Sequence, residues 1–114
     1  MEVLGPAQQI MEAALAVRSA RAELLASNVA NADTPGYAAR DVNFGQALDQ
    51  VLGSGGDSLD SANTVVVENL GYDGNDVDLN QQLGKAFENS LSYVATLKLY
   101  GDSMGRVKSA TSSS

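Results

Sequence analysis

The chain has 114 residues, a formal net charge of −7, and neither cysteine nor histidine. This length allows one small domain, and the missing residue types exclude a disulfide framework, thiolate or imidazole metal ligands and histidine-based catalysis. Residues 41–84 hold eight acids and no base, which disfavours nucleic-acid binding because phosphate contacts need clustered Lys and Arg.

The N-terminal segment predicts one long helix. Pro6 suits a first helical position, and residues 7–32 contain neither Gly nor Pro. We expect no secretory signal before it, and no run in the chain reaches the roughly 20 apolar residues of a membrane span. Two seams with 4-and-3 spacing run along the helix, so it needs more than one neighbour, unless it is an ordinary helix with a wide core-facing stripe. The first seam is Ala7, Ile10, Ala14, Val17, Arg21, Leu24, Asn28, and the second is Leu4, Met11, Leu15, Arg18, Ala22, Leu25, Val29, Ala32.

The segment after this helix predicts a sharp turn at residues 34–37. Proline and glycine occupy the two central positions, as in a type II turn, so the helix should end near Ala32 or Asp33. Asn28 and Asn31 lie in its last turns. Their amides either bond freed carbonyls or a neighbouring chain, or remain solvated.

The middle of the chain carries weaker signals. Residues 37–44 alternate loosely and are expected to be extended, residues 46–52 are weakly helical, and residues 53–58 have a linker composition. Residues 64–67 are strand-like. Because a single strand is not stable alone, this one pairs with residues 37–44, pairs with a neighbouring molecule, or stays disordered.

The acidic loop at residues 71–76 invites comparison with a calcium-binding loop. The comparison fails because the required glycine and final glutamate are missing at the positions counted from Asp73 or Asp76. A helix start fits better, with Asp78 as N-cap and Gln81 completing a capping box.

A second long helix is expected from Leu79 to about Ser109. Its first seam is Leu83, Phe87, Ser90, Val94, Leu97, Gly101, Met104, and its second is Ala86, Tyr93, Tyr100, Val107. Three interior glycines each cost about 1 kcal/mol relative to alanine, so the end beyond Tyr100 needs outside support or frays.

Together these elements predict a mainly α protein. Its long N- and C-terminal helices pack as an antiparallel coiled-coil hairpin around a short irregular or β-containing middle. The expected divisions are 1–33 for the first helix, 34–77 for the turn and middle, 78–109 for the second helix and 110–114 for a polar tail. The hairpin has more apolar helix surface than it buries by itself, so folding is expected to be coupled to self-association.

Residues 27–37, continued by residues 38–44, resemble the N-terminal signature of the rod and hook axial proteins of the bacterial flagellum. Residues 73–79 and 88–93 are similar to the C-terminal region of the proximal rod members of that family. The middle of this chain is shorter than is usual among them, which argues against a compact outer β domain.

The resemblance implies a structural subunit of the proximal rod of the basal body, without enzymatic activity, cofactor, metal or small-molecule substrate. Such subunits form a tube that transmits torque and surrounds the export channel. Implied partners are further copies of the chain, other rod proteins, the hook–basal-body junction protein, the membrane ring protein and the export apparatus. The implied location is the periplasmic rod, reached by the flagellar type III pathway. A helical adaptor or export chaperone is the alternative.

Contacts between subunits are expected at both helices and at the turn. The expected residues are Ile10, Val17, Leu24, Leu25, Asn28, Asn31, Thr34, Pro35, Gly36, Tyr37, Leu83, Phe87, Leu91, Val94, Leu97 and Met104.

Overall fold

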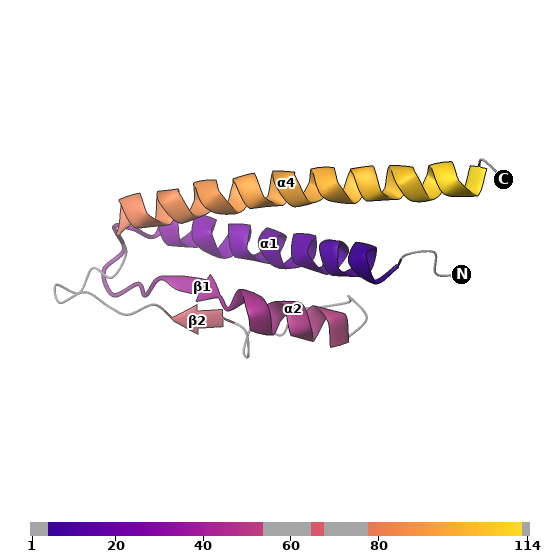
Figure 1. Cartoon of the computed structure of the whole chain (residues 1–114). Coiled ribbons are helices and arrows are strands. Elements are labelled where there is room, and N and C mark those ends of the chain that lie inside the picture. The colour runs from indigo at the N-terminus through magenta and orange to yellow at the C-terminus, as the bar shows by residue number, and fades with distance from the viewer. Residues whose placement is uncertain (1–4, 54–64, 68–77, 113–114) are drawn as a thin grey trace.

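The computed structural model describes residues 5–53, 65–67 and 78–112. Its elements in chain order are α1 (Pro6–Ala30), β1 (Arg40–Val42), α2 (Phe44–Gly53), β2 (Val65–Val67) and α4 (Leu79–Ser112). Figure 1 shows α1 and α4 lying side by side, with β1, β2 and α2 on the opposite side of α1. The acidic loop at residues 71–76 and all but the first residue of the predicted linker at residues 53–58 lie outside the described residues.

Helices α1 and α4 run antiparallel, as predicted. Near the start of α4, the Asn28 side chain donates to Gln82 Oε1 at 2.8 Å. Near its other end, Ser103 accepts a hydrogen bond from Gln8, close to the start of α1. The predicted mainly α hairpin with a short β-containing middle is therefore confirmed.

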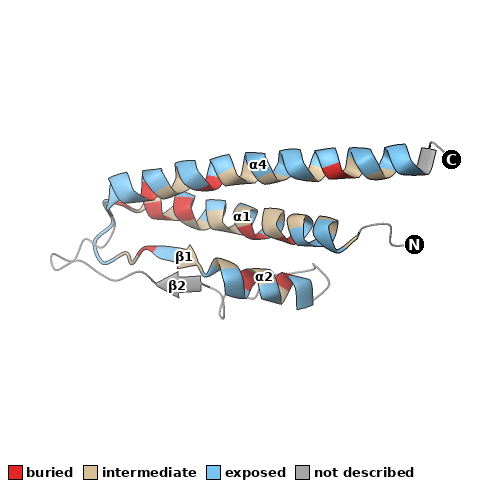
Figure 2. Cartoon of the chain, in the orientation of Figure 1, coloured by how far each residue is buried: buried red, intermediate tan, exposed pale blue. Residues whose placement is uncertain are grey.

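The main apolar cluster lies between α1 and α2. Its buried members are Ala13, Val17, Ala47 and Val51, with Val42, Phe44 and Leu48 packed around them. In α2 the buried positions are four residues apart and so share one face of the helix. Figure 2 shows buried positions on α2 as well as on α1 and α4. The Arg18 guanidinium carbon also lies 4.6 Å from the centre of the Phe44 ring, which adds a cation–π contact between the two helices.

The predicted turn is present. Gly36 has φ +77°, and the Tyr37 N–H donates to the Thr34 carbonyl at 3.2 Å. Helix α1 ends at Ala30, slightly before the predicted Ala32 or Asp33. After it the hydrogen-bond pattern changes, because the Ala32 N–H donates to the Val29 carbonyl three residues back and the Asn31 side-chain Nδ2 donates to the Ser27 carbonyl.

The strands settle the pairing that the sequence left open. Strand β1 pairs antiparallel with β2, with Arg40 opposite Val67 and Val42 opposite Val65. Phe44, expected in an extended segment, is instead the first residue of α2. Asn43 caps this helix by accepting a hydrogen bond from the Gln46 N–H at 3.1 Å.

Helix α4 begins and ends as a single long element of 34 residues. Asp78 accepts from the Gln81 N–H at 3.2 Å, so the predicted N-cap is confirmed. The helix continues through Gly101 and Gly105 and extends beyond the predicted end at Ser109. At both of these glycines a Cβ would meet open space, so no close approach of another segment requires them.

Candidate functional site

Asn28 lies fully buried where α1, β1 and α4 meet. Its Nδ2 donates to the Arg40 carbonyl at 2.7 Å and to Gln82 Oε1 at 2.8 Å. Its Oδ1 accepts from the Arg40 N–H at 3.0 Å and from the Tyr37 hydroxyl at 3.4 Å. The amide therefore uses its full hydrogen-bonding capacity inside the chain. The solvated alternative for Asn28 is wrong, and this residue is an internal junction between three elements.

The turn residues support this junction from the α1 side. The Ser27 and Tyr37 hydroxyls lie 2.9 Å apart in a hydrogen bond. Asn31 Oδ1 accepts from Thr34 Oγ1 at 3.1 Å, which fixes the first residue of the turn. Thr34, together with the Pro35 and Gly36 that follow it, is exposed, so this part of the turn is available to another molecule.

A second polar contact joins the same three elements two helical turns away. Arg21 of α1 donates from Nε and Nη2 to the two carboxylate oxygens of Asp41, at 2.7 and 3.0 Å. Lys85 Nζ of α4 lies 3.7 Å from Asp41 Oδ2. Burial opposes ionisation of Asp41, but the bonds from Arg21 and the Val42 N–H, with the Arg21 and Lys85 charges, leave its pKa below the ordinary value. The hydrogen bond to Asp41 outweighs burial and raises the pKa of Arg21.

The outer face of α4 is apolar and uncovered within the described chain. We call five of the large exposed side chains of α4 the α4 ridge: Leu83, Phe87, Leu91, Val94 and Leu97. Phe87 is 67% exposed and Val94 63%, and Figure 2 shows α4 largely exposed. Four of the five come from the predicted first seam of this helix. These four side chains are therefore exposed rather than buried against α1.

Polar residues occupy the face of α4 that does pack on α1. Gln82, Asn89 and Ser103 are buried there. The predicted second seam shares this face, with Ala86, Tyr93, Tyr100 and Val107 all half-buried. The sequence analysis missed the buried polar residues, although a signal exists: positions 82, 89, 96 and 103 are polar and follow one another at intervals of seven.

The predicted contact residues of α1 have different surroundings. Val17 and Leu25 are fully buried within the chain, Leu24 is half-buried, and Ile10 is largely exposed. Met104, the last predicted contact of α4, is half-buried. The structure therefore brings Val17 and Leu25 into internal packing and leaves Ile10 and the α4 ridge accessible.

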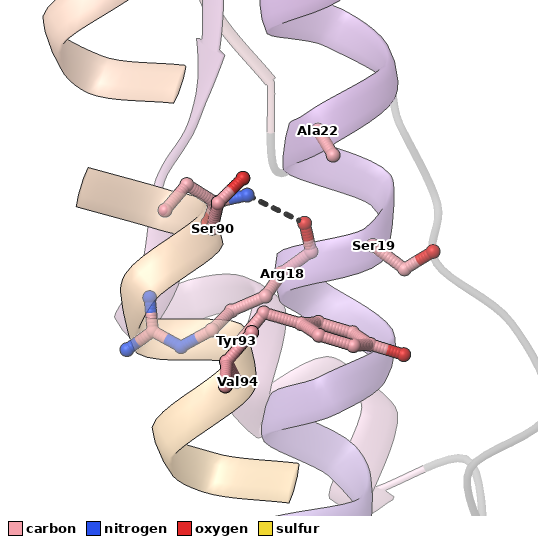
Figure 3. A pocket seen from close by; sticks show the side chains of 7 residues that line it. Arg18, Ser19, Ala22, Ser90, Tyr93 and Val94 are labelled. Atoms are coloured by element: carbon pink, nitrogen blue, oxygen red, sulfur yellow. Dashed lines mark hydrogen bonds between the residues drawn. The ribbon is translucent and has the colours of Figure 1, made fainter. Parts of the chain in front are cut away.

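An open pocket of about 260 Å³ lies between α1 and α4. Its lining residues are Arg18, Ser19, Ala22, Asn89, Ser90, Tyr93 and Val94. Asn89 Nδ2 donates to the Arg18 carbonyl at 3.0 Å, the bond dashed in Figure 3. In the same view the Tyr93 ring reaches from α4 towards α1.

Comparison with known proteins decides the family. The family model described as "Flagella basal body rod protein" matches residues 9–37, which span most of α1 and the turn. The FlgB flagellar basal body rod protein of Aeromonas hydrophila is 40% identical over 106 residues, covering 78% of this chain and 80% of that protein. The chain belongs to the FlgB flagellar basal body rod protein family.

Other FlgB relatives extend the match over nearly the whole chain. The Yersinia ruckeri protein is 32% identical over 130 positions, covering 95% of this chain and 93% of its own length. The Escherichia coli K12 protein is 34% identical over 119 positions, covering 85% and 86%. Because both alignments are longer than 114 residues, these FlgB proteins carry insertions that this chain lacks.

Membership of the FlgB family makes the chain a structural rod subunit of the flagellar basal body, and the adaptor or chaperone alternative is not favoured. The segment matched by the family model includes Asn28 and the turn, but not Arg40 or Gln82, to which Asn28 bonds. None of the helices in the described parts of the chain is long and apolar enough to cross a membrane.

Proposed function

We propose that the chain is a subunit of the proximal rod, and that α1 and α4 build the wall of a tube that surrounds the export channel and transmits torque. The observation that carries this proposal is the α4 ridge. Five large apolar side chains follow one another at helical spacing on a surface that the described chain leaves open.

The orientation of α4 supports an assembly role. A two-helix protein that functions alone gains most by turning its apolar face inward, because burial of apolar surface is the main stabilising contribution. Here α4 turns Gln82, Asn89 and Ser103 inward and Phe87 and Val94 outward. A contiguous exposed apolar surface of this kind is typical of an interaction site. We therefore infer that the exposed apolar face of α4 contacts another subunit.

The partners and location proposed for the chain follow its family. Partners are other copies of the chain, other rod proteins, the hook–basal-body junction protein, the membrane ring protein and the export apparatus. The location is the periplasmic rod, reached by type III export. The contact surface comprises the α4 ridge, Ile10 and the exposed turn, while Val17, Leu25 and Asn28 act by holding the hairpin together. We further propose that the chain has no catalytic role.

A charge placed on the α4 ridge tests the proposal. In a strain that lacks its own proximal rod subunit, the unsubstituted chain should restore rods. Val94→Asp should abolish them, because assembly would bury the new carboxylate against a neighbouring helix without a partner, which costs free energy. Ala95→Asp is the matched control, since Ala95 is exposed on the neighbouring face of the same helix. Rods counted in isolated basal bodies provide the measurement. Equal rod numbers for the two variants would contradict a role for the ridge.

A further inference from the structure

The exposed apolar face of α4 continues into a base. Phe87, Leu91 and Val94 of the α4 ridge follow one another at intervals of four and three residues, and Lys98 comes four residues after Val94. These four side chains therefore share one face of the helix. The Lys98 side chain is 77% exposed, and its ion pair with Asp102 at 3.6 Å is exposed as well, so that pair contributes little. A helix that covers the ridge therefore also meets the charge of Lys98.

The open face of α1 has the opposite character. Its members follow one another at intervals of three, four, three and four residues, and all are exposed: Ala16, Ser19, Glu23, Ala26 and Ala30. Glu23 is the one charged residue of this set. Among the described residues its carboxylate forms no hydrogen bond or ion pair. The face therefore offers small side chains and one available negative charge, where the ridge offers large side chains and a positive charge.

The bases of α1 do not reduce this complementarity. Arg18 and Arg21 are both half-buried and are used inside the chain. Arg21 binds Asp41, and the Arg18 guanidinium lies over the Phe44 ring. Every charged side chain that α1 exposes is therefore an acid.

Lys98 and Glu23 lie far apart within one chain. Lys98 is close to Tyr100, whose hydroxyl donates to Glu12 of α1 at 3.0 Å. Glu12 precedes Glu23 by 11 residues, which is about 16 Å along a helix. A contact between these two charges therefore requires two molecules.

We propose that the α4 ridge of one copy of the chain packs against the open face of α1 in a second copy, with Lys98 beside Glu23. The inference rests on the proposed rod function and adds the surface and the register that join one copy to the next. The interface is heterologous, because the two copies contribute different helices, and such contacts extend into open assemblies.

The charge pair sets the register of the two facing helices. Copies in an open assembly point the same way, and α1 and α4 are antiparallel in each, so the facing helices are antiparallel too. With Lys98 opposite Glu23, Leu91 lies opposite Ala30, because each is seven residues from its charged residue. Phe87 then falls at the exposed turn that follows α1. The ridge and the turn, both left open by the single chain, are covered together.

Disulfide crosslinking tests the register, because the chain has no native cysteine. Leu91→Cys chains are expressed together with Ala30→Cys chains in a strain that lacks its own proximal rod subunit, and the isolated basal bodies are oxidised. The two chains should be joined at least about tenfold more than Leu91→Cys and Ala16→Cys chains, since Cα atoms more than about 7 Å apart form no disulfide. Ala16 is the residue that a parallel arrangement would place opposite Leu91. Preferential joining to Ala16→Cys, or to neither, would overturn the proposal.

Exchange of the two charges tests the contact without changing an apolar residue. Glu23→Lys and Lys98→Glu should each lower the number of rods at least about tenfold, because each places like charges together in the interface. A chain with both changes should recover to within about threefold of the unsubstituted chain, because the attraction between copies is restored. Asp49→Lys makes the same change of charge on the exposed face of α2 and should have less than about a twofold effect. A double variant that assembles no better than the single variants would contradict the contact.

The two proposals fail in different ways. If Val94→Asp prevents rods while the double variant does not recover and the Ala30→Cys crosslink is missing, the ridge docks on another surface. That outcome rejects this interface and leaves the proposed rod function standing. If Val94→Asp assembles as well as Ala95→Asp, the role of the ridge in the rod is rejected together with this interface.

Discussion

Arg21 and Asp41 form a two-bond ion pair between α1 and β1, with nitrogen–oxygen distances of 2.7 and 3.0 Å. The pair is only partly exposed, at 16% for each side chain. Two parallel charge-assisted bonds fix direction as well as distance. With Lys85 approaching the same carboxylate, Asp41 connects the β1 segment to both long helices.

The Asp41 contact predicts a specific response to acid. The folded state lowers the pKa of Asp41, so the contact stabilises the fold above the unfolded-state pKa of about 4 and is lost as the pH falls through the lower folded value. Asp41→Asn should therefore destabilise the chain by about 1–3 kcal/mol at pH 7 and weaken the dependence of stability on pH below about 4. Urea titrations followed by circular dichroism, with an osmolyte to favour the folded state, measure both effects.

Asp49→Asn provides the control for this experiment. Asp49 is exposed on α2. Among the described residues, its side chain forms no hydrogen bond or ion pair with α1, β1 or α4. Its replacement should leave stability within about 0.5 kcal/mol at pH 7. An Asp41→Asn chain as stable as Asp49→Asn would show that the ion pair contributes nothing.

The Asn28 junction predicts an assembly defect. Asn28→Ala together with Asn31→Ala should prevent rod assembly without abolishing helicity, because it removes the bonds that hold β1 and the turn against α1 and α4. Of the single variants, Asn28→Ala should be the more severe, since it removes four hydrogen bonds that join α1 to the turn, β1 and α4. Motility and basal-body images measure assembly. Fully motile cells carrying the double change would count against this account.

Gly36 predicts a conformational cost. Its φ of +77° is unfavourable for residues with a side chain, so Gly36→Ala should destabilise the hairpin by about 1–2 kcal/mol even though a Cβ would meet open space. Gly45→Ala is the matched change within α2, where alanine is the better helix former and should stabilise by up to about 1 kcal/mol. Urea midpoints of the two variants, measured with the same osmolyte that favours the folded state, should move in opposite directions. A shift in the same direction would reject the turn geometry as the cause.

The exposed ridge predicts how the isolated chain behaves. Purified alone, it should show low helicity and no cooperative thermal transition, because the side chains of the α4 ridge stay 47–67% exposed when the chain folds by itself. Helicity should rise when rod partners are added. Circular dichroism combined with size-exclusion chromatography tests this. A compact monomer that melts cooperatively would contradict the coupling of folding to assembly.

The two long helices and the turn could be predicted because their signals are local. Pro6, the proline and glycine of the turn, and Asp78 each act through their own backbone conformation or through a cap a few residues away. The direction in which α4 faces could not be predicted, because either seam satisfies helical periodicity. Only the long-range contacts, such as Asn28 with Gln82, decide between them.

In the candidate site, too, local features could be predicted from the sequence and long-range contacts could not. Asn28 was identified from the sequence because it lies in a recognisable motif, whereas its partners in β1 and α4 are distant in sequence and carry no local signal. Asp41 was one of eight acids in residues 41–84, and its pairing depends on the fold that brings Arg21 beside it. The cap at Asn43 was missed, although Asn43 and Gln46 have capping-box spacing.

The polar interval of seven along α4 has a final consequence. When α1 and α4 separate, the hydrogen bonds between them are replaced by hydrogen bonds to water. Separating the two helices therefore costs less free energy than opening an apolar interface of the same size. Identical copies present identical positions along α1 and α4. Exchange of α4 between copies would therefore preserve the same contacts, which is the way domain swapping joins single chains into a polymer.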